Sequence, residues 1–597
     1  MPDIYAKHDS QELYFRTPFG AVKPKDNVIL RLEGKNIGKV ELEIILFDGH
    51  RMSVPMEQRW AGDMQIFEKN IHIKEEHIGI INYYFTIYAY NQVFYYGNNH
   101  DGLGGEGRIY NKNPPYYQIT VYREFKVPAW YKEGIVYQIF VDRFCNGNED
   151  GKVLNPKKNS FIYANWDDEP MYIKDDKGDI KRWEFYGGNL KGVIEKLDYL
   201  KSLYVTVIYL NPIFESSSNH KYDTADYKKI DPMFGNEEIF KELCLEAEKR
   251  GIRIILDGVF SHTGADSVYF NKFGRYKALG AYQSKDSPYY NWYRFIQYPD
   301  IYECWWGIDN QPNVDELNRS YMDFIINDED SVIKKWIKLG ASGWRLDVAD
   351  ELPDPFIEQL KKEMKKTRED SVLIGEVWED ASNKISYSKS REYLFGHELD
   401  SVTNYPFRGA VISFLNGHIT SHEFSRRMMS IYENYPPEAF YSNLNILGTH
   451  DTERILTMFH AKGDKAVLYM ELAVAIQMTF PGVPLIYYGD EAGVKGGTDP
   501  DNRRTYPWGK ENKYIMNLYR RLTSIRNKHD VFKKGNIRFY NSHQDILCFE
   551  RFYGGNRAFV IVNRHPSNRI CLDIPEQRLH MDMNPLSFKI IMDLWEI

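Results

Sequence analysis

Between about residues 130 and 508 the chain repeats one pattern, in which a short apolar run is followed by a polar loop and then by apolar positions three and four residues apart. Short apolar runs bounded by loops are typical of buried parallel strands, and the wider spacing is typical of amphipathic helices, here expected at 237–249, 330–338 and 355–366. The apolar runs lie at 135–141, 205–210, 252–259, 343–348, 372–377, 402–407 (the weakest), 444–447 and 483–488. Eight strands with intervening helices predict an α/β fold, a (β/α)8 TIM barrel whose chemistry takes place at the carboxyl ends of its strands.

The chain on either side of this repeat is β-rich. In residues 1–124, runs such as 28–32 and 80–96 are separated by Gly, Asn and Asp turns, which predicts an N-terminal β-sandwich domain. In residues 511–597, alternating runs flank a Gly-Gly-Asn turn at 554–556, which predicts a C-terminal antiparallel β-domain.

The predicted catalytic domain, residues 125–510, contains one connection that is much longer than a usual barrel loop. The segment at about 263–319, after the third strand, is dense in Tyr, Trp, Gly and Asp. A loop of that length in a compact domain is usually a functional insertion, so we expect a small subdomain beside the active face of the barrel.

Composition narrows the choice of partner and compartment. A net charge of −8 and a pI near 6.1 argue against nucleic acid, because phosphate binding needs a basic surface. No stretch of membrane-spanning length is apolar throughout, so no membrane association is expected. The five scattered cysteines suggest neither a disulfide framework nor a zinc site, and the first residues do not resemble a secretory signal. We therefore expect a cytoplasmic protein, although a trimmed signal peptide would make it a secreted one.

A charged pair lies at the end of the fourth apolar run. Arg345 and Asp347 are two residues apart, so on a strand they point to the same face. A cation that close favours the ionised carboxylate that a nucleophile needs. Taken alone, such a pair is more often a structural salt bridge.

Other acidic motifs fall at the ends of the neighbouring predicted strands. Asp257 and His262 close the third strand, Glu376 closes the fifth, and His450 and Asp451 close the seventh. Several carboxylates converging on one face would repel one another unless a function required them.

Cleavage of a glycosidic bond needs two carboxyls with different roles, one ionised and one protonated. Asp347, beside Arg345, suits the nucleophile, and Glu376, on an apolar strand where burial favours the protonated form, suits the general acid/base. Asp451 would stabilise an oxocarbenium-like transition state, while His262 and His450 donate hydrogen bonds to the same sugar.

These motifs, in this order and spacing, resemble the short signature regions of the α-amylase family of retaining glycoside hydrolases. The signature regions lie at 257–262, 343–347, 375–378 and 450–451, and the likeness extends to 209–214, 219–227 and 482–491. With the N-terminal β-domain, the chain looks most similar to the neopullulanase, cyclomaltodextrinase and maltogenic amylase branch. The resemblance implies that residues 1–124 form a carbohydrate-binding-like domain or a dimerisation domain. The resemblance covers the chain from about Trp130 onward, and its motifs are specific when taken together.

The resemblance implies the same three catalytic residues, Asp347, Glu376 and Asp451. It also implies a sugar-binding set, in which Tyr222 stacks on the sugar at the cleavage point and Trp378 stacks on the leaving-group side. The remaining members of this set are His262, Arg345, His450 and the pair Asp499 and Arg503.

A possible Ca²⁺ site is also implied, and no organic cofactor. The residues that would supply its oxygen ligands are Asn146, Asn148, Asp150, Gly187 and Asn189. The chain departs from the family pattern twice, because Asn189 replaces an expected Asp and Ser261 stands where many members have a calcium-binding Asn. A polar turn without metal is the alternative.

The sequence therefore predicts a retaining α-glucan hydrolase that acts on maltodextrins, cyclodextrins or pullulan, on α-1,4 bonds with α-1,6 bonds as a further option. Its expected partners are α-glucan oligosaccharides or polysaccharides and a second copy of the chain, as a homodimer through the N-terminal domain. The alternatives are a transglycosylase or α-1,6-glucosidase on the same scaffold, or a non-catalytic glucan-binding protein. Bond preference, substrate length and oligomeric state are left open by the sequence.

Overall fold

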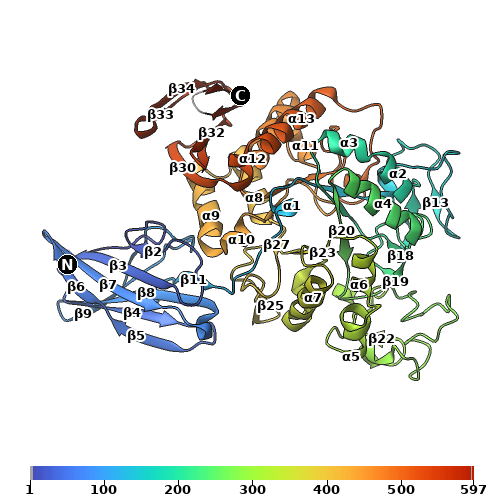
Figure 1. Ribbon diagram of the computed structural model, residues 1–597, viewed down its shortest axis with the longest axis horizontal. Coiled ribbons are helices and arrows are strands. Elements are labelled where there is room, and N and C mark those ends of the chain that lie inside the picture. The colour runs from blue at the N-terminus through green and yellow to red at the C-terminus, as the bar shows by residue number, and fades with distance from the viewer. Residues whose placement is uncertain (1–3, 593–594, 597) are drawn as a thin grey trace. The chain divides into compact units, whose positions relative to one another are not determined.

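A computed structural model describes residues 4–592, 595 and 596 of the chain (Figure 1). The chain forms two compact units. Unit 1 consists of Met1–Lys126, Glu379–Asp400 and Ile419–Tyr441, and unit 2 consists of Val127–Trp378, Ser401–His418 and Ser442–Ile597.

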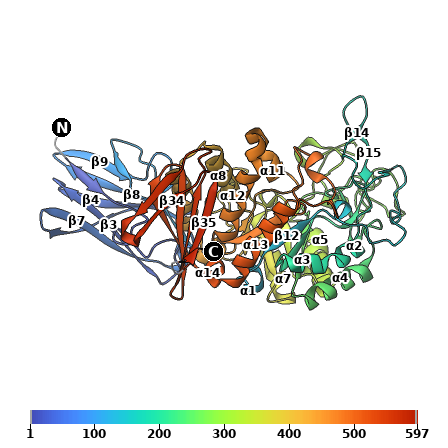
Figure 2. The same ribbon diagram turned by 90° about the horizontal axis from the view of Figure 1, so that it is seen from above.

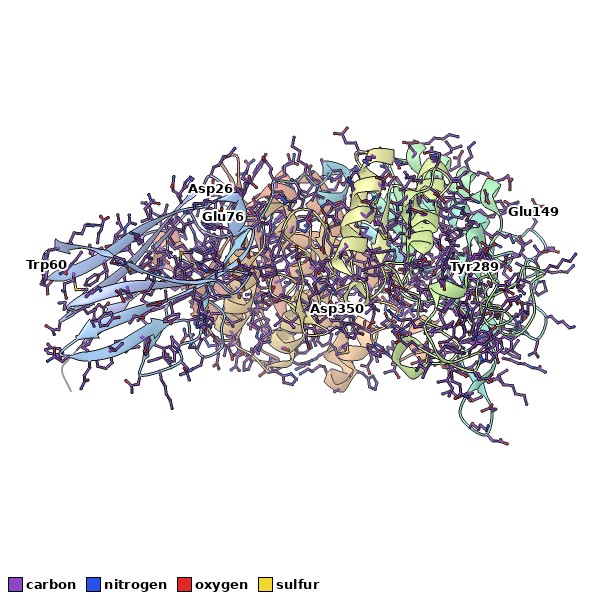
Figure 3. All side chains as sticks on the ribbon, turned by 90° about the horizontal axis from the view of Figure 1, so that it is seen from below. Asp26, Trp60, Glu76, Glu149, Tyr289 and Asp350 are labelled. Atoms are coloured by element: carbon purple, nitrogen blue, oxygen red, sulfur yellow. The ribbon has the colours of Figure 1, made fainter. Side chains whose placement is uncertain are left out.

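Two antiparallel sheets form the N-terminal part of unit 1, with strand orders β1-β3-β7-β6 and β10-β9-β8-β4-β5. Strand β2 pairs with β3, and β11 pairs with β8. The strands are β1 (Tyr5–Lys7), β2 (Arg16–Thr17), β3 (Asn27–Lys35), β4 (Lys39–Ile45), β5 (Arg51–Pro55), β6 (Glu57–Ala61), β7 (Met64–His72), β8 (Gly79–Ala89), β9 (Gln92–Gly97), β10 (Arg108–Tyr110) and β11 (Tyr117–Val121). Alternate residues of β3 point inward, and Leu30 and Leu32 share a buried core with Leu42 and Phe85 of the second sheet. The predicted N-terminal β-sandwich is confirmed, with Trp60 exposed on its edge strand β6 (Figure 3).

Two segments from the middle of the chain complete unit 1. They carry the β25–β26 hairpin (Ile385–Ser386 and Lys389–Ser390) and the helices α9 (Ser421–Asn434) and α10 (Pro437–Phe440). Helix α9 ends beside the sandwich, where the buried Arg16 Nη1 lies 2.7 Å from Glu433 Oε1. Arg16 also donates from Nη1 to the Gln118 carbonyl oxygen and from Nη2 to the Gly20 carbonyl oxygen, so both terminal nitrogens of the buried guanidinium are hydrogen-bonded.

The barrel of unit 2 is an eight-stranded parallel sheet with the order β27-β24-β23-β20-β17-β12-β29-β28. Its strands are β12 (Val136–Ile139), β17 (Val207–Leu210), β20 (Arg253–Gly258), β23 (Gly343–Leu346), β24 (Val372–Gly375), β27 (Ser401–Val402), β28 (Leu444–Asn445) and β29 (Val483–Tyr487). A parallel bridge between Thr403 and Leu444 joins the two ends of this order. The predicted (β/α)8 barrel is therefore confirmed: seven predicted strands contain the observed one, and the sixth overlaps β27 at Val402.

The sixth strand is shorter than the pattern indicated. Only Ser401–Val402 pair as strand β27, and helix α8 (Tyr405–Asn416) begins where the prediction extended the strand to residue 407. Asn404 caps this helix by accepting from the backbone N–H of Phe407, and Pro406 lies in its first turn. Because an Asn cap followed by proline favours a helix start, the apolar residues after it belong to the helix.

Along the chain, the helices of unit 2 alternate with its strands or groups of strands (Figures 1 and 2). They are α1 (Ala129–Lys132), α2 (Leu190–Glu195), α3 (Leu197–Ser202), α4 (Glu237–Lys249), α5 (Arg319–Met322), α6 (Val332–Lys338), α7 (Asp354–Thr367), α8, α11 (Ile455–Met458), α12 (Ala466–Thr479), α13 (Lys513–Lys528) and α14 (Asp530–Lys534). Helix α4 has the predicted bounds because Asn236 caps its start and its Phe240, Leu243 and Ala247 are buried in turn.

The insertion after β20 is largely irregular, and the C-terminal part is built of antiparallel strands. The insertion contains β21 (Phe295–Gln297) and β22 (Ile301–Tyr302) around packed aromatic rings such as Phe270 and Tyr302. The C-terminal strands are β30 (Asn536–His543), β31 (Ile546–Tyr553), β32 (Asn556–Asn563), β33 (Ile570–Ile574), β34 (Leu579–Met583), β35 (Ser587–Met592) and β36 (Trp595–Glu596). They form a five-stranded antiparallel sheet and the β33–β34 hairpin. Strands β31 and β32 pair around the turn at 554–556, as the sequence predicted.

Within the described part of the chain, no helix has the length and apolar character needed to cross a bilayer. All five cysteines are free thiols.

Replacing Glu433 by Met should weaken unit 1 by about 3–5 kcal/mol, because it leaves the buried Arg16 charge without its partner. Hydrogen exchange of the β3 and β8 amides in the whole protein measures this loss. The matched control is the double variant Arg16→Met with Glu433→Met, which removes both charges and should exchange more slowly than the single variant. Equal rates of hydrogen exchange in the two variants would contradict the prediction that an unpaired Arg16 charge weakens unit 1.

Candidate active site

Adjacent barrel strands bring three of the acidic motifs together. Asp257 in β20 is the register partner of Arg345 in β23, so both side chains leave the sheet at the same level. Asp347 follows the end of β23, and Glu376 follows the end of β24. All four side chains are buried at the carboxyl end of the barrel.

The Arg345 guanidinium binds all three carboxylates. Its Nη1 lies 2.7 Å from Asp257 Oδ1 and 2.9 Å from Asp347 Oδ1, and its Nη2 lies 2.7 Å from Glu376 Oε2. Taken alone, Arg345 and Asp347 resembled a structural salt bridge. In the structure they belong to a cluster of four residues with Asp257 and Glu376. The expectation that Arg345 serves Asp347 is correct only in part, because one cation is shared among three acids.

Two further donors hold Glu376. Its Oε2 accepts from the Val348 backbone N–H at 2.8 Å, and its Oε1 accepts from Trp378 Nε1 at 3.1 Å. Val348 has φ = 35°, a left-handed conformation that is costly for a β-branched residue. This strained turn directly after Asp347 aims the Val348 N–H at Glu376, so the positions of the two carboxyls are linked through the backbone.

The carboxyls outnumber the cations in this cluster. Burial raises the pKa of Asp347 well above its ordinary range, and the charge of Arg345 opposes that rise. Burial likewise raises the pKa of Asp257. An excess of buried carboxyls favours retention of a proton among them, which a site that needs both an acid and a base requires.

A second chain of polar contacts contains the other acidic candidates. His450 Nε2 lies 3.1 Å from Asp451 Oδ2, and Arg503 reaches Asp451 Oδ1 at 3.5 Å and Asp499 Oδ1 at 2.9 Å. Asp451 keeps 34% of its side chain open to solvent. Partial burial and then the neighbouring Glu376 carboxylate raise the pKa of Asp451 to about 7.

Tyr222 joins the two groups. Its hydroxyl donates to Asp257 Oδ2 at 2.8 Å and lies 2.6 Å from His450 Nε2, while the two rings are nearly parallel at 5.3 Å. His262 Nε2 is 3.0 Å from the Tyr222 carbonyl oxygen, so His262 supports Tyr222. Burial lowers the pKa of His262 to about 4 and that of His450 well below its ordinary value, so both rings are neutral at pH 7.

The structure thus brings all ten predicted catalytic and sugar-binding residues into one connected region, while their individual roles stay predictions. It adds three tyrosines that the sequence analysis did not place. Tyr209 donates to Asp257, Tyr405 stacks on Trp378 at 4.0 Å, and Tyr172 donates to Asp499. Two of them had a signal in the sequence, because Tyr209 begins the stretch 209–214 that shares the family resemblance and Tyr405 precedes the proline that starts helix α8.

The predicted calcium ligands form a hydrogen-bonded loop. Asn146 Oδ1 accepts from the Asn148 N–H and from Asn189 Nδ2, and Asn189 Oδ1 accepts from Gly147 N–H and, as the cap of helix α2, from Gly192 N–H. Because these oxygens already bind amide donors, the loop as arranged does not fit a calcium cage. Glu149 of the same loop extends outward (Figure 3). The calcium site, including Asp150 and Gly187, stays a prediction, and no catalytic step depends on it.

Replacing Asp451 by Asn should stabilise the protein in a pH-dependent way. The carboxyl titrates near pH 7 in the folded protein and at about pH 4 in the unfolded chain, so unfolding is accompanied by proton release between these values and the folded state loses stability as the pH rises. The variant should match the unsubstituted protein at pH 4 and melt at least about 2 °C higher at pH 8. Calorimetry at pH 4, 6 and 8 tests this, with exposed Asp176→Asn as control. A difference that does not change with pH would be inconsistent with the prediction.

The chain is similar to known proteins in both sequence and fold. Residues 138–514 match the family model described as alpha amylase, catalytic domain. The amylopullulanase of Thermoanaerobacter thermohydrosulfuricus is 38% identical over 95% of this chain and 42% of its own length. The chain spans between 33% and 48% of the length of the three amylopullulanases that it matches.

Two further relatives are similar over most of their own length. The cyclomaltodextrinase of Thermoanaerobacter pseudethanolicus is 32% identical over 89% of this chain and 90% of its own. The solved structure of cyclic alpha-maltosyl-(1-->6)-maltose hydrolase from Arthrobacter globiformis matches with a TM-score of 0.68 and 28% identity, over 79% of this chain and all of that one. The shared barrel, the family match and the order of the strand-end motifs agree, and the chain belongs to the α-amylase family.

Proposed function

We propose that the chain is a retaining α-glucan hydrolase that cleaves α-1,4 glucosidic bonds, together with some α-1,6 bonds, in maltodextrins, cyclodextrins or pullulan. The observation that carries the proposal is the Arg345 fork, which binds Asp347 through Nη1 and Glu376 through Nη2. Two carboxyls on one guanidinium lie close together, which favours the separation of about 5–5.5 Å typical of retaining enzymes over the wider spacing of inverting ones.

In this mechanism Asp347 attacks the anomeric carbon while Glu376 gives its proton to the leaving oxygen, so that one glycosidic bond breaks and one ester bond forms. Glu376, now ionised, then takes a proton from water as that water attacks the anomeric carbon and releases Asp347. The Val348 N–H and Trp378 Nε1 hold the Glu376 carboxylate at both oxygens, which keeps it positioned in both half-reactions. Asp451, His450 and Arg503 bind sugar hydroxyls, and Tyr222 stacks on the ring at the cleavage point.

The relatives support this substrate class by their names, which include amylopullulanase, cyclomaltodextrinase and a neopullulanase of Thermoactinomyces vulgaris. Most of these names refer to α-glucans, so we propose α-glucan oligosaccharides or polysaccharides as the partners of this chain. A homodimer through the N-terminal sandwich is proposed as well, since edge strand β6 has neighbour β7 on one side and exposes Trp60. A cytoplasmic location stays a prediction of the sequence.

Replacing Glu376 by Gln should lower turnover of maltotriose by about 10²–10⁴-fold, because the amide cannot supply a proton. Binding of maltotriose, measured by calorimetry, should remain. The control is Glu379→Gln, an exposed acid three residues further on that pairs with Lys384. Near-normal turnover in the Glu376 variant would rule out the assignment, while binding without any sugar release by the unsubstituted protein would favour the non-catalytic alternative.

Pullulan distinguishes the bond preferences. Cleavage of its α-1,4 bonds yields panose-type trisaccharides and cleavage of its α-1,6 bonds yields maltotriose, so chromatography of the products separates the two. We expect the panose type to dominate. Maltotriose as the main product would identify an α-1,6-glucosidase, and products longer than the substrate repeat would identify a transglycosylase.

A further inference from the structure

A second cleft, of about 280 Å³, lies within unit 2 and is not used by the proposed mechanism. Three segments form it: the connection after β12, the turn between β18 (Phe214–Ser216) and β19 (Thr224–Ile230), and the insertion after β20. The connection contributes strand β15 (Ile180–Arg182), which pairs with β14 (Ile173–Lys174) in a hairpin that projects from unit 2 (Figure 2). Ligand pockets begin at about 300 Å³, so this cleft has the size for a ligand of about one sugar.

The lining of this cleft is cationic. It contains two acidic residues and five basic ones, which are Lys157, Lys158, Lys181, Arg182 and Arg275. The chain as a whole carries a net charge of −8, so the cleft has the opposite sign to the protein around it. A cleft lined by one sign of charge attracts ligands of the other sign, which here means an anion.

The two acids of the lining are already held by neighbouring side chains. Asp266 Oδ2 lies 2.6 Å from Arg275 Nη1 and also accepts from the Ser217 hydroxyl. Asp223 Oδ1 accepts from the Ser216 hydroxyl at 2.5 Å. Arg275 engages these neighbours through Nη1 alone, and its Nε and Nη2 bond to none of the described residues. Two of its donor groups therefore stay available to a ligand.

Three of the cations have no partner. The side chains of Lys158, Lys181 and Arg182 are exposed, and none of them pairs or hydrogen-bonds with a residue that the structure describes. We refer to these three as the unpaired cations. Lys157 differs, because its Nζ lies 2.5 Å from Asp231 Oδ2. Ammonium and guanidinium groups that converge on one small cleft suit a phosphate, whose oxygens accept several charged hydrogen bonds at once.

Aromatic rings beside the cations suit a sugar. Phe273 is 61% exposed and lines the cleft, and the Arg275 guanidinium lies 5.9 Å from the centre of its ring. Trp183 also lines the cleft, and its Nε1 donates to none of the described residues. A flat apolar ring next to a cation fits a ligand that joins a sugar ring to a phosphate.

The cleft lies beside the residue predicted to stack on the reacting sugar. Asp223 of the lining directly follows Tyr222 in the chain. The Trp183 ring meets the His220 ring edge-on at 4.9 Å, and the His220 ring lies 5.9 Å from that of Tyr222. Two ring contacts thus connect this cleft to the candidate active site.

We propose that the cleft binds the phosphate monoester of a hexose, with the phosphoryl group held by the unpaired cations and Arg275 and the sugar ring against Phe273. The phosphoryl group belongs either to a free hexose phosphate or to a phosphorylated glucosyl unit of an α-glucan chain. The second source rests on the proposed function, whereas the site itself does not.

Calorimetry of the whole protein with glucose 6-phosphate tests the phosphoryl part at about pH 7.5, where the phosphate carries close to two negative charges. The double variant Lys181→Gln with Arg182→Gln should bind glucose 6-phosphate at least about tenfold more weakly, because charged hydrogen bonds are lost. The matched control is Lys174→Gln with Lys177→Gln, which removes two exposed lysines of the same hairpin outside the cleft and changes the net charge equally. Equal weakening in both double variants, or none in the first, would overturn the proposal.

A second comparison tests the sugar part. Glucose 6-phosphate should bind at least about tenfold more tightly than glucose or inorganic phosphate, since each of these lacks half of the recognised ligand. Phe273→Ala should weaken binding of glucose 6-phosphate and leave that of inorganic phosphate unchanged. If inorganic phosphate binds as tightly as glucose 6-phosphate and Phe273→Ala has no effect, the cleft is a plain anion site and the proposal is wrong.

The source of the phosphoryl group is identified with maltoheptaose that carries a 6-phosphate, bound to the Glu376→Gln variant so that it is not cleaved. Affinity at least about tenfold above that of glucose 6-phosphate supports a phosphorylated glucan, because the active site then holds the rest of the chain. Equal affinity supports a free hexose phosphate. Failure of the unsubstituted protein to bind glucose 6-phosphate would overturn this site and leave the proposed hydrolysis standing, while binding without hydrolysis of maltotriose would overturn the proposed function alone.

Discussion

The site depends on one buried guanidinium. Arg345 contacts the carboxyls of Asp257, Asp347 and Glu376, which come from three adjacent strands. Without this cation, three buried acids at hydrogen-bond distance from a common point would repel one another, and burial alone would favour their neutral forms. Arg345 thus sets where the strand ends meet and which charges the site can carry.

Two features of the site oppose stability. The left-handed conformation of Val348 is strained, and the raised pKa of Asp451 means that ionisation above pH 7 works against the fold. Both lie beside the proposed reacting carbon. The Val348 N–H positions Glu376, and the proposed role of Asp451 is to stabilise positive charge on a sugar. The surrounding barrel strands, buried along their length, compensate for this local cost.

The fold was predictable wherever one physical signal dominated. The eight apolar runs predicted the barrel strands, and the apolar spacing of three and four residues predicted helix α4 with its observed bounds. Prediction failed at 402–407, where the cap and proline outweighed the apolar run. The acidic and histidine candidates were found because strand-end position is readable from the sequence. Tyr172 was not, since a tyrosine in a long irregular connection has no periodicity that marks its contact with Asp499.

Domain boundaries were less readable, because the chain leaves and re-enters unit 1. Residues 379–400 and 419–441 join a sandwich whose strands end at Val121, and Glu433 neutralises Arg16 across more than four hundred positions of sequence. When only the sandwich strands have been synthesised, Glu433, which neutralises Arg16, has not yet been added to the chain. The N-terminal strands must wait for most of the barrel to emerge before their unit is complete, so the two units are linked in time during synthesis as well as in sequence.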